Sequence, residues 1–145
     1  MATENLSWSD HALTTLERAG HRKGGARLAV IGLLETQSCA LNALEIEEGL
    51  KSSGVKVGRA SIYRALEQLE ELGLLRRLDV SKGTASYERI DPEGHHHHHI
   101  VCDECGKVVP FEDPKLELAI SAVERSSDFD ISGHEVILRG QCANC

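Results

Sequence analysis

Four cysteines arranged as two C-x-x-C pairs are the residues with the most specific chemistry in this sequence. They stand in Cys102-Asp-Glu-Cys105 and Cys142-Ala-Asn-Cys145. Four thiolates around one Zn²⁺ ion make a closed tetrahedral site, which leaves no position for a substrate. The alternative is a redox C-x-x-C motif, which would place one pair at the start of a helix that follows a strand. Two pairs favour a structural zinc ion whose binding contributes to folding.

Five consecutive histidines, His95 to His99, precede the first cysteine pair. The run is internal, has five members, and leads directly into the apolar residues 100–101, so we interpret it as the start of a strand rather than an expression tag. Side chains alternate between the two faces of a strand. One short run can therefore supply ligands to two different metal sites.

The first of these predicted sites has three nitrogen ligands and one oxygen ligand. They are His96, His98, Glu117 and His134. A lone histidine such as His134 usually has no special role, but its combination with the histidine run favours a role as a metal ligand. These ligands suit Zn²⁺ and also Fe²⁺, Mn²⁺, Co²⁺ or Ni²⁺, and the general order of affinities does not choose among them.

The second predicted site uses the opposite face of the histidine run and would bridge two domains. Its expected ligands are Glu88, His97, His99 and Cys39, the cysteine left over from the two pairs. Cys39 has an alternative interpretation, because an unpaired cysteine is commonly just a small buried hydrophobic side chain.

Apolar residues at helical spacing predict four helices in the first half of the chain. The first helix presents Ala12, Leu13, Leu16 and Ala19, and the second presents Leu28, Ile31 and Leu34 or close neighbours of these residues. The third begins with Asn42 and Glu45 as a capping box and ends at Gly54. The fourth runs from about 59 to 72 and buries Ile62, Leu66 and Leu69.

Two strand-like runs, 74–80 and 84–90, follow the fourth helix and flank a turn at 81–83. Helices followed by such a hairpin predict a winged helix-turn-helix, with a helical bundle and a trailing hairpin as the alternative. The first turns of the fourth helix, the end by which recognition helices usually dock, present Arg59, Ser61, Tyr63 and Arg64.

The remaining segments complete an α+β chain of two domains. We expect a DNA-binding domain at 1–91, a hinge at 92–94, and a small dimerisation and metal-binding domain at 95–145. The second domain is predicted to contain strands at 95–102, 107–111 and 133–140 and a helix at 113–124.

The net charge of -7 is unevenly distributed along the chain. Residues 1–91 hold 12 Lys and Arg against 13 Asp and Glu, whereas residues 92–145 hold 4 against 10. The acidic residues therefore concentrate where we expect the metal sites. We see no transmembrane span and no secretory signal, and with C-x-x-C pairs this favours the cytoplasm.

Over nearly its full length the sequence resembles the ferric uptake regulator family. The resemblance rests on residues 60–66 (Ala-Ser-Ile-Tyr-Arg-Ala-Leu), Gly73-Leu-Leu, the histidine run with Ile-Val-Cys-Asp-Glu-Cys-Gly-Lys, and Gly140-Gln-Cys-Ala-Asn-Cys145. It implies a homodimeric repressor that binds palindromic double-stranded operator DNA when loaded with metal. By position Tyr63 and Arg64 would contact DNA, with Ser61 and Arg59 as further candidates. Arg22 and Lys82 are candidates for phosphate contacts, or simply solvated charges.

The sequence departs from the family pattern at the second regulatory site. Ala40 and Pro110 stand where a histidine and a glutamate are expected, and Ile90 stands where zinc-sensing members carry a cysteine. The histidine-rich ligands favour control of zinc uptake by Zn²⁺, with Fe²⁺ as the alternative and Ni²⁺ or Mn²⁺ behind it. We expect no membrane and no small-molecule substrate as partner.

Two other classes of protein fit the sequence less well than a repressor. A zinc hydrolase would need an open metal position and a substrate pocket, for which a domain of about 50 residues offers little volume. A metal-storage or delivery protein would explain the histidines but not the winged helix.

Overall fold

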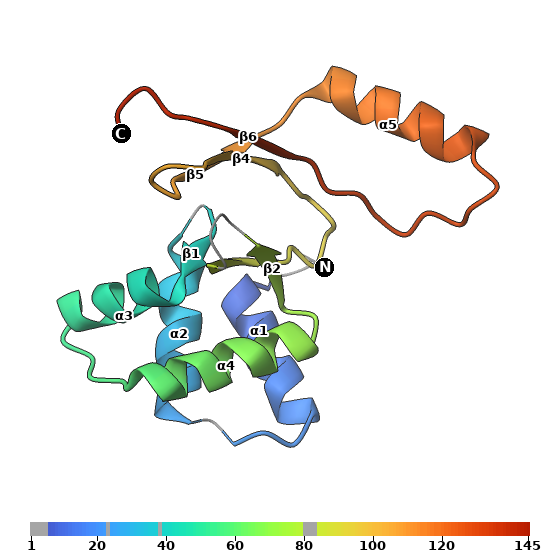
Figure 1. The fold of residues 1–145 in the computed structure, drawn as a ribbon. Helices are drawn as coiled ribbons and strands as arrows, with labels where there is room; N and C mark the ends of the chain where they lie inside the picture. The colour runs from blue at the N-terminus through green and yellow to red at the C-terminus, as the bar shows by residue number, and fades with distance from the viewer. Residues whose placement is uncertain (1–5, 23, 38, 80–83) are drawn as a thin grey trace. The chain divides into compact units, whose positions relative to one another are not determined.

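The computed structural model describes residues 6–22, 24–37, 39–79 and 84–145, which form two compact units, 1–96 and 97–145 (Figure 1). Each unit has its own three-stranded sheet. Within the described residues, no helix combines the length and the apolar character that crossing a bilayer requires.

Four helices form the core of the first unit. They are α1 (Trp8–Arg18), α2 (Gly25–Glu35), α3 (Ala43–Ser52) and α4 (Arg59–Glu71). The side chains that α4 buries are those expected from its periodicity, Ile62, Leu66 and Leu69, together with Ala65. On α2 the predicted Ile31 and Leu34 are buried together with their neighbour Val30, but Leu28 is 41% exposed, so the prediction is wrong at that residue. Small and aliphatic residues lie on most sides of α2, so the spacing of its apolar residues does not identify which face is buried.

Local hydrogen bonds explain where α3 starts. The Asn42 side chain accepts a hydrogen bond from the Glu45 N–H at 2.8 Å, and the Glu45 carboxylate accepts one from the Asn42 N–H at 3.1 Å. The predicted capping box is thus confirmed. Gly54 and Gly73, which follow α3 and α4, have φ of 77° and 72°, a left-handed conformation that favours glycine at helix ends.

The sheet of the first unit contains the predicted hairpin and one strand that the sequence did not indicate. Strands β2 (Leu75–Asp79) and β3 (Ala85–Arg89) pair antiparallel, and β1 (Leu41–Asn42) adds to the free edge of β3. The turn predicted at 81–83 lies outside the described residues. This mixed unit contradicts the alternative of a helical bundle with a trailing hairpin.

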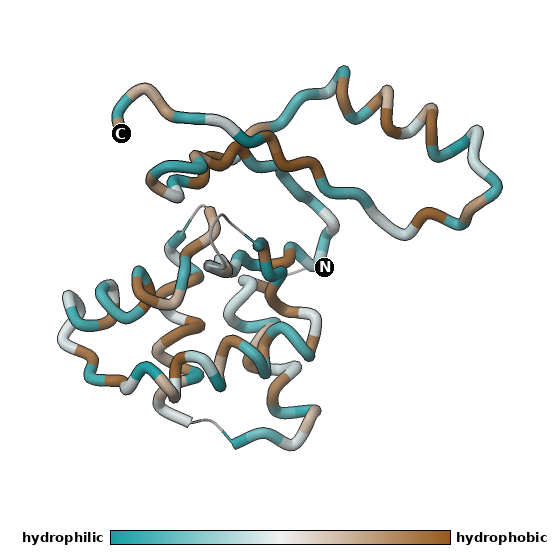
Figure 2. Tube along the Cα trace, in the orientation of Figure 1, coloured by the Kyte–Doolittle hydropathy of each residue, from teal (hydrophilic) through white to brown (hydrophobic). Residues whose placement is uncertain are grey.

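The second unit is a sheet in the order β5-β4-β6 with one helix. Its elements are β4 (His98–Cys102), β5 (Val108–Phe111), α5 (Pro114–Ser126) and β6 (Ile137–Gly140). β4 pairs antiparallel with β5 and parallel with β6. In Figure 2, hydrophobic and hydrophilic segments alternate along α5, which buries no residue within this chain.

Two strand boundaries in this unit differ from the prediction. The strand expected from His95 starts only at His98, and the one expected from Gly133 starts at Ile137. A strand needs a neighbouring strand to pair with. In the antiparallel pair, Phe111, the last residue of β5, lies opposite His98, so β5 has no residue to pair with the histidines before His98. Beyond Phe111 the chain turns into α5, where Asp113 caps the helix and Pro114 occupies its first turn. His134 therefore lies in the segment before β6 and not on the strand.

Packing beneath α4 gives a prediction about stability. Leu66 is fully buried, so Leu66→Ala should lower the free energy of unfolding by about 2–5 kcal/mol through lost burial and a residual cavity. The matched change Leu44→Ala removes the same atoms from a side chain that is 52% exposed on α3 and should cost much less. Urea unfolding followed by circular dichroism measures both, and equal losses would contradict the packing described for α4.

Candidate metal centres

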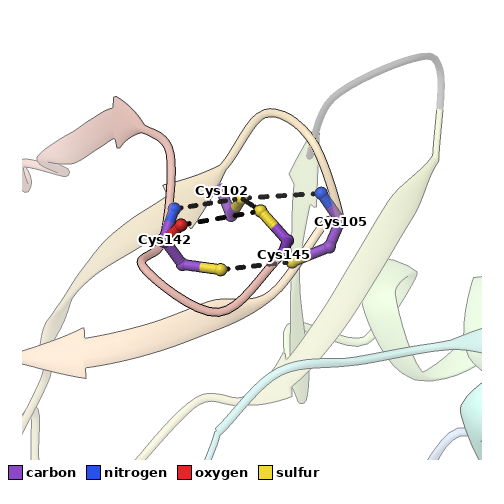
Figure 3. A group of neighbouring side chains, drawn as sticks. All are labelled: Cys102, Cys105, Cys142 and Cys145. Carbon is purple, nitrogen blue, oxygen red and sulfur yellow. Dashed lines mark hydrogen bonds between the residues drawn. The ribbon is translucent and has the colours of Figure 1, made fainter.

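The parallel pairing of β4 and β6 brings the two cysteine pairs together. Cys102, the last residue of β4, lies opposite Gly140, the last residue of β6. The chain turns after each strand, so the two turns emerge at the same end of the sheet. Cys105 lies in the first turn, and Cys142 and Cys145 lie in the second (Figure 3).

The four sulfur atoms are spaced as ligands of one ion. Sγ of Cys102 lies 3.5 Å from Sγ of Cys145, Sγ of Cys105 lies 3.7 Å from Sγ of Cys142, and all four lie within 4.8 Å of one another. A disulfide would require about 2.05 Å. A tetrahedral ion with sulfur ligands at about 2.3 Å separates them by about 3.8 Å. The residues present therefore fit a tetrahedral metal ion.

Backbone amides prepare one of these sulfurs to carry negative charge. The N–H groups of Cys105 and Cys142 donate to Sγ of Cys102 at 3.5 and 3.3 Å, shown as dashed lines in Figure 3, and they lower the pKa of this thiol to about 6. The neighbouring sulfurs of Cys142 and Cys102 raise the pKa of Cys145 to about 12. The Lys107 N–H lowers the pKa of Cys105, but the adjacent Cys102 and Cys142 outweigh it, so the net shift is upward. Four thiolates this close need a cation between them.

A second cluster lies at the other end of β4. Glu117 on α5 places one carboxylate oxygen against Nε2 of His98 and the other 2.8 Å from Nε2 of His134. His98 is almost fully buried, and the ligand atoms of the three residues lie within 4.8 Å of one another. Hydrogen bonds from His98 first, and then from His134, lower the pKa of Glu117. Two imidazoles and an ionised carboxylate can hold a divalent cation.

The ring of His98 also has a partner on its other nitrogen. The N–H of Val136 donates to Nδ1 at 3.3 Å, so Nδ1 is the acceptor and Nε2 carries the hydrogen that Glu117 accepts. A cation bound at Nε2 would move the ring hydrogen to Nδ1, where the Val136 N–H stands. This contact would then have to open. The fourth expected ligand, His96, stands two residues before His98, and its participation stays a prediction.

The ligands expected for the other regulatory site belong to different units. In the second unit the rings of His97 and His99 lie with their centroids 4.8 Å apart in an edge-to-face arrangement, so the two side chains are neighbours. In the first unit Glu88 is on β3, and Cys39 lies between α2 and β1. A site formed by all four residues stays a prediction.

The candidate DNA contacts gather at the start of α4, apart from two. Tyr63 is 45% exposed, Arg64 is exposed, and the Arg64 guanidinium donates to the Ser61 hydroxyl at 3.3 Å. Arg59 is also exposed and forms an ion pair with Glu47 of α3 at 2.8 Å. Arg22 lies in the exposed segment before α2, and Lys82 lies outside the described residues.

One residue near the histidine cluster was not found from the sequence. Oε1 of Glu124 lies 3.2 Å from Nδ1 of His134. Glu124 follows Glu117 by seven residues, which is two turns of α5 and places both on one side of the helix. The seven-residue spacing of these two glutamates is the signal in the sequence by which Glu124 could have been found.

The cysteine cluster gives a prediction about metal content. Cys102→Ser removes one of the four sulfur ligands, so the purified protein should lose about one metal ion per chain. It should also melt at a lower temperature, because metal binding contributes to folding. Elemental analysis and thermal unfolding measure the two effects. The control is Ala143→Ser, which adds a hydroxyl to an exposed residue between Cys142 and Cys145, leaves all four sulfurs in place and should keep the metal. Full metal content in the Cys102 variant would exclude the four-sulfur site.

Comparison with known proteins places this arrangement in a family. The profile of the Ferric uptake regulator family matches residues 18–139. The Ferric uptake regulation protein of Neisseria meningitidis is 35% identical over 134 residues, which cover 92% of each protein. The Vibrio cholerae ferric uptake regulator superposes with a TM-score of 0.78 at 28% identity, covering 89% of this chain and 98% of that one.

A second solved structure is described by its metal sites. The Helicobacter pylori ferric uptake regulator, reported to have three functional metal-binding sites, superposes with a TM-score of 0.79 at 25% identity, covering 96% of this chain and 91% of that one. Members of the family are metal-binding transcriptional regulators and not enzymes. The chain described here belongs to the Ferric uptake regulator family and is a metal-responsive transcriptional regulator.

Proposed function

We propose that this protein is a zinc-responsive repressor that binds palindromic operator DNA as a homodimer when its regulatory sites hold metal. The observation that carries the proposal is the pair of clusters on β4, four sulfurs at one end and imidazoles with a carboxylate at the other. A closed sulfur site suits a permanent structural Zn²⁺. The histidine cluster, with fewer charged ligands and partial exposure, suits an ion that comes and goes. Acting on operator DNA places the protein in the cytoplasm.

The start of α4 is the proposed DNA-reading surface. Its exposed end presents Tyr63 and Arg64, while Leu66 and Leu69 anchor the opposite face in the core. An aromatic ring and a guanidinium suit base edges in the major groove, where arginine pairs with guanine and apolar atoms meet the thymine methyl. Ser61, Arg59, Arg22 and Lys82 are proposed as supporting contacts, mainly to phosphates.

Two exposed apolar surfaces of the second unit support a homodimer. One is a row across the sheet, because Ile100 pairs with Val109 on one side and with Leu138 on the other, and paired residues share a face. All three are at least 40% exposed. The other surface is α5 and the segment after it, where Leu118, Val123 and Phe129 are more than two-thirds exposed. Apolar surfaces of this kind mark interfaces between chains.

The proposed response to metal is a shift between orientations of the two units. A dimer grips two half-sites only when its recognition helices are separated by about one DNA turn, roughly 34–36 Å. Ligands contributed by both units, Glu88 and Cys39 from the first and His97 and His99 from the second, would favour one orientation when an ion joins them. If the ion binds more tightly to the orientation that fits DNA than to the others, it increases the population of chains in that orientation.

Iron is the second candidate for the sensed metal. It is favoured by the 35% identical relative from Neisseria meningitidis, which is named for ferric uptake regulation. Zinc is favoured by the histidine run and by the set of three imidazoles and one carboxylate, and by Ala40 and Pro110, which stand where the iron-sensing pattern predicts a histidine and a glutamate. Nitrogen and oxygen ligands also suit manganese and nickel, which rank behind iron as candidates.

A DNA-binding experiment tests this function. The zinc-containing protein is used to select duplexes from a pool with a random core, in buffers with free Zn²⁺, Fe²⁺ without oxygen, Mn²⁺ or Ni²⁺ set by chelators. Selected sequences should be palindromic, and Zn²⁺ should give the tightest binding, about 5–150-fold tighter than without regulatory metal. Metal binding without any effect on DNA affinity would instead indicate a storage or delivery protein.

Arg64→Ala should weaken binding to the selected duplex by about 1–3 kcal/mol, because a base contact is lost. Arg18→Ala, which removes the same charge from the exposed end of α1, is the matched control. Equal effects of the two changes would remove Arg64 from the reading surface. If the selection experiment gives the tightest DNA binding with Fe²⁺, the protein would still be a repressor, but iron and not zinc would be the metal it senses.

The α5 surface gives a prediction about assembly. Leu118→Asp together with Val123→Asp should dissociate the dimer, because each change places a charge in a surface proposed to be dry. Lys115→Asp, on an exposed position of the same helix, should leave the dimer intact. Sedimentation velocity over a range of concentrations measures the outcome. An undissociated dimer of the double variant would exclude this surface.

A further inference from the structure

The imidazole of His134 lies between two carboxylates of the same helix. Its Nε2 is 2.8 Å from Oε2 of Glu117, and its Nδ1 is 3.2 Å from Oε1 of Glu124. Glu117 also contacts His98 and therefore belongs to the histidine cluster. Glu124 contacts the far side of the His134 ring, so its role must be different.

The geometry of α5 produces this arrangement. Glu117 and Glu124 are separated by seven residues, which is a rise of about 10.5 Å and nearly two full turns, so the two side chains extend from the same side of the helix. The segment that returns from α5 towards β6 carries His134 between them. All three side chains are partly shielded, with exposures of 37% for Glu117, 31% for Glu124 and 23% for His134.

Hydrogen-bond chemistry assigns different tasks to the two ring nitrogens. An ionised carboxylate can only accept hydrogen bonds. A histidine that binds a cation through one nitrogen keeps its hydrogen on the other, and a carboxylate there fixes the tautomer and the direction of the ring and makes the ligand more basic. Nδ1 of His134 faces such a carboxylate. Nδ1 of His98, in contrast, accepts from the Val136 N–H, which opposes binding of a cation at Nε2.

We infer that Glu124 is a positioning residue for the regulatory metal centre: it accepts a hydrogen bond from Nδ1 of His134 and turns Nε2 towards Glu117 and His98. Glu124 is not itself a ligand to the ion. The inference rests on the proposed function of the cluster that contains His98, Glu117 and His134. It adds that metal binding at this centre depends on Glu124, a carboxylate two helical turns after the ligand Glu117 on α5.

The test measures cobalt affinity at this centre in the full-length dimer with its cysteine site already filled by zinc. Co²⁺ added to this protein reports nitrogen and oxygen ligation by its visible absorption, and competition with a chelator gives its affinity. Four variants are compared with the unchanged protein: Glu124→Ala, Glu124→Gln, Glu135→Ala and His134→Ala. Glu135→Ala is the matched control, because it removes the same charge from the exposed residue next to His134.

Glu124→Ala should weaken Co²⁺ binding by about 10–100-fold, the usual effect of removing the partner of a ligating histidine. Glu124→Gln should recover most of this loss, because the amide oxygen still accepts from Nδ1, and Glu135→Ala should change the affinity much less. Nitrogen-15 spectra of the zinc-loaded protein should show His134 with hydrogen on Nδ1, and this signal should shift in Glu124→Ala.

Three results would overturn the inference. Equal affinities of the Glu124→Ala and Glu135→Ala variants would leave only a general effect of charge. A loss in Glu124→Gln as large as in Glu124→Ala would show that Glu124 binds the ion directly. A hydrogen on Nε2 in the zinc-loaded protein would reverse the roles of the two nitrogens. If His134→Ala also leaves Co²⁺ binding unchanged, the proposed centre itself fails.

Discussion

The parallel pairing of β4 with β6 is the constraint on which both candidate metal centres depend. It aligns Cys102 with Gly140, which places the two cysteine turns at one end of the sheet. It also aligns His99 with Ile137, which brings the segment containing His134 beside His98. Parallel strands require a crossover, and here α5 provides it while supplying Glu117. One strand pair thus brings together ligands that are far apart in the sequence, both in the sulfur cluster, where Cys102 and Cys142 are 40 residues apart, and in the imidazole cluster of His98 and His134.

Local chemistry made much of this fold predictable. The capping box at Asn42, the glycine ends of α3 and α4, and the buried face of α4 follow from hydrogen bonds and periodicity within a few residues. The four-sulfur cluster was predictable because two C-x-x-C pairs leave few other chemical uses. Membership of the Ferric uptake regulator family was predictable from the same motifs, and the family match over residues 18–139 confirms it.

What could not be predicted depends on partners that are distant in the sequence. The start of β4 at His98 is set by where β5 ends, and nothing in the histidine run itself marks that position. The addition of β1 to β3 involves only two residues, too few for a periodic signal. Glu124 was missed because a glutamate on an amphipathic helix is ordinarily a solvated charge, and only the returning segment with His134 gives it a partner.

The apolar row formed by Val109, Ile100 and Leu138 has a thermodynamic consequence. Within one chain the second unit buries no residue of α5 and leaves this row exposed, so in the proposed dimer its folded state would depend on association as well as on metal. The thermal stability of such a dimer would vary with protein concentration, and dilution and chelation would both lower it. The concentration of such a regulator in the cell would then affect its stability, because a lower concentration leaves a larger fraction of the chains dissociated and unfolded.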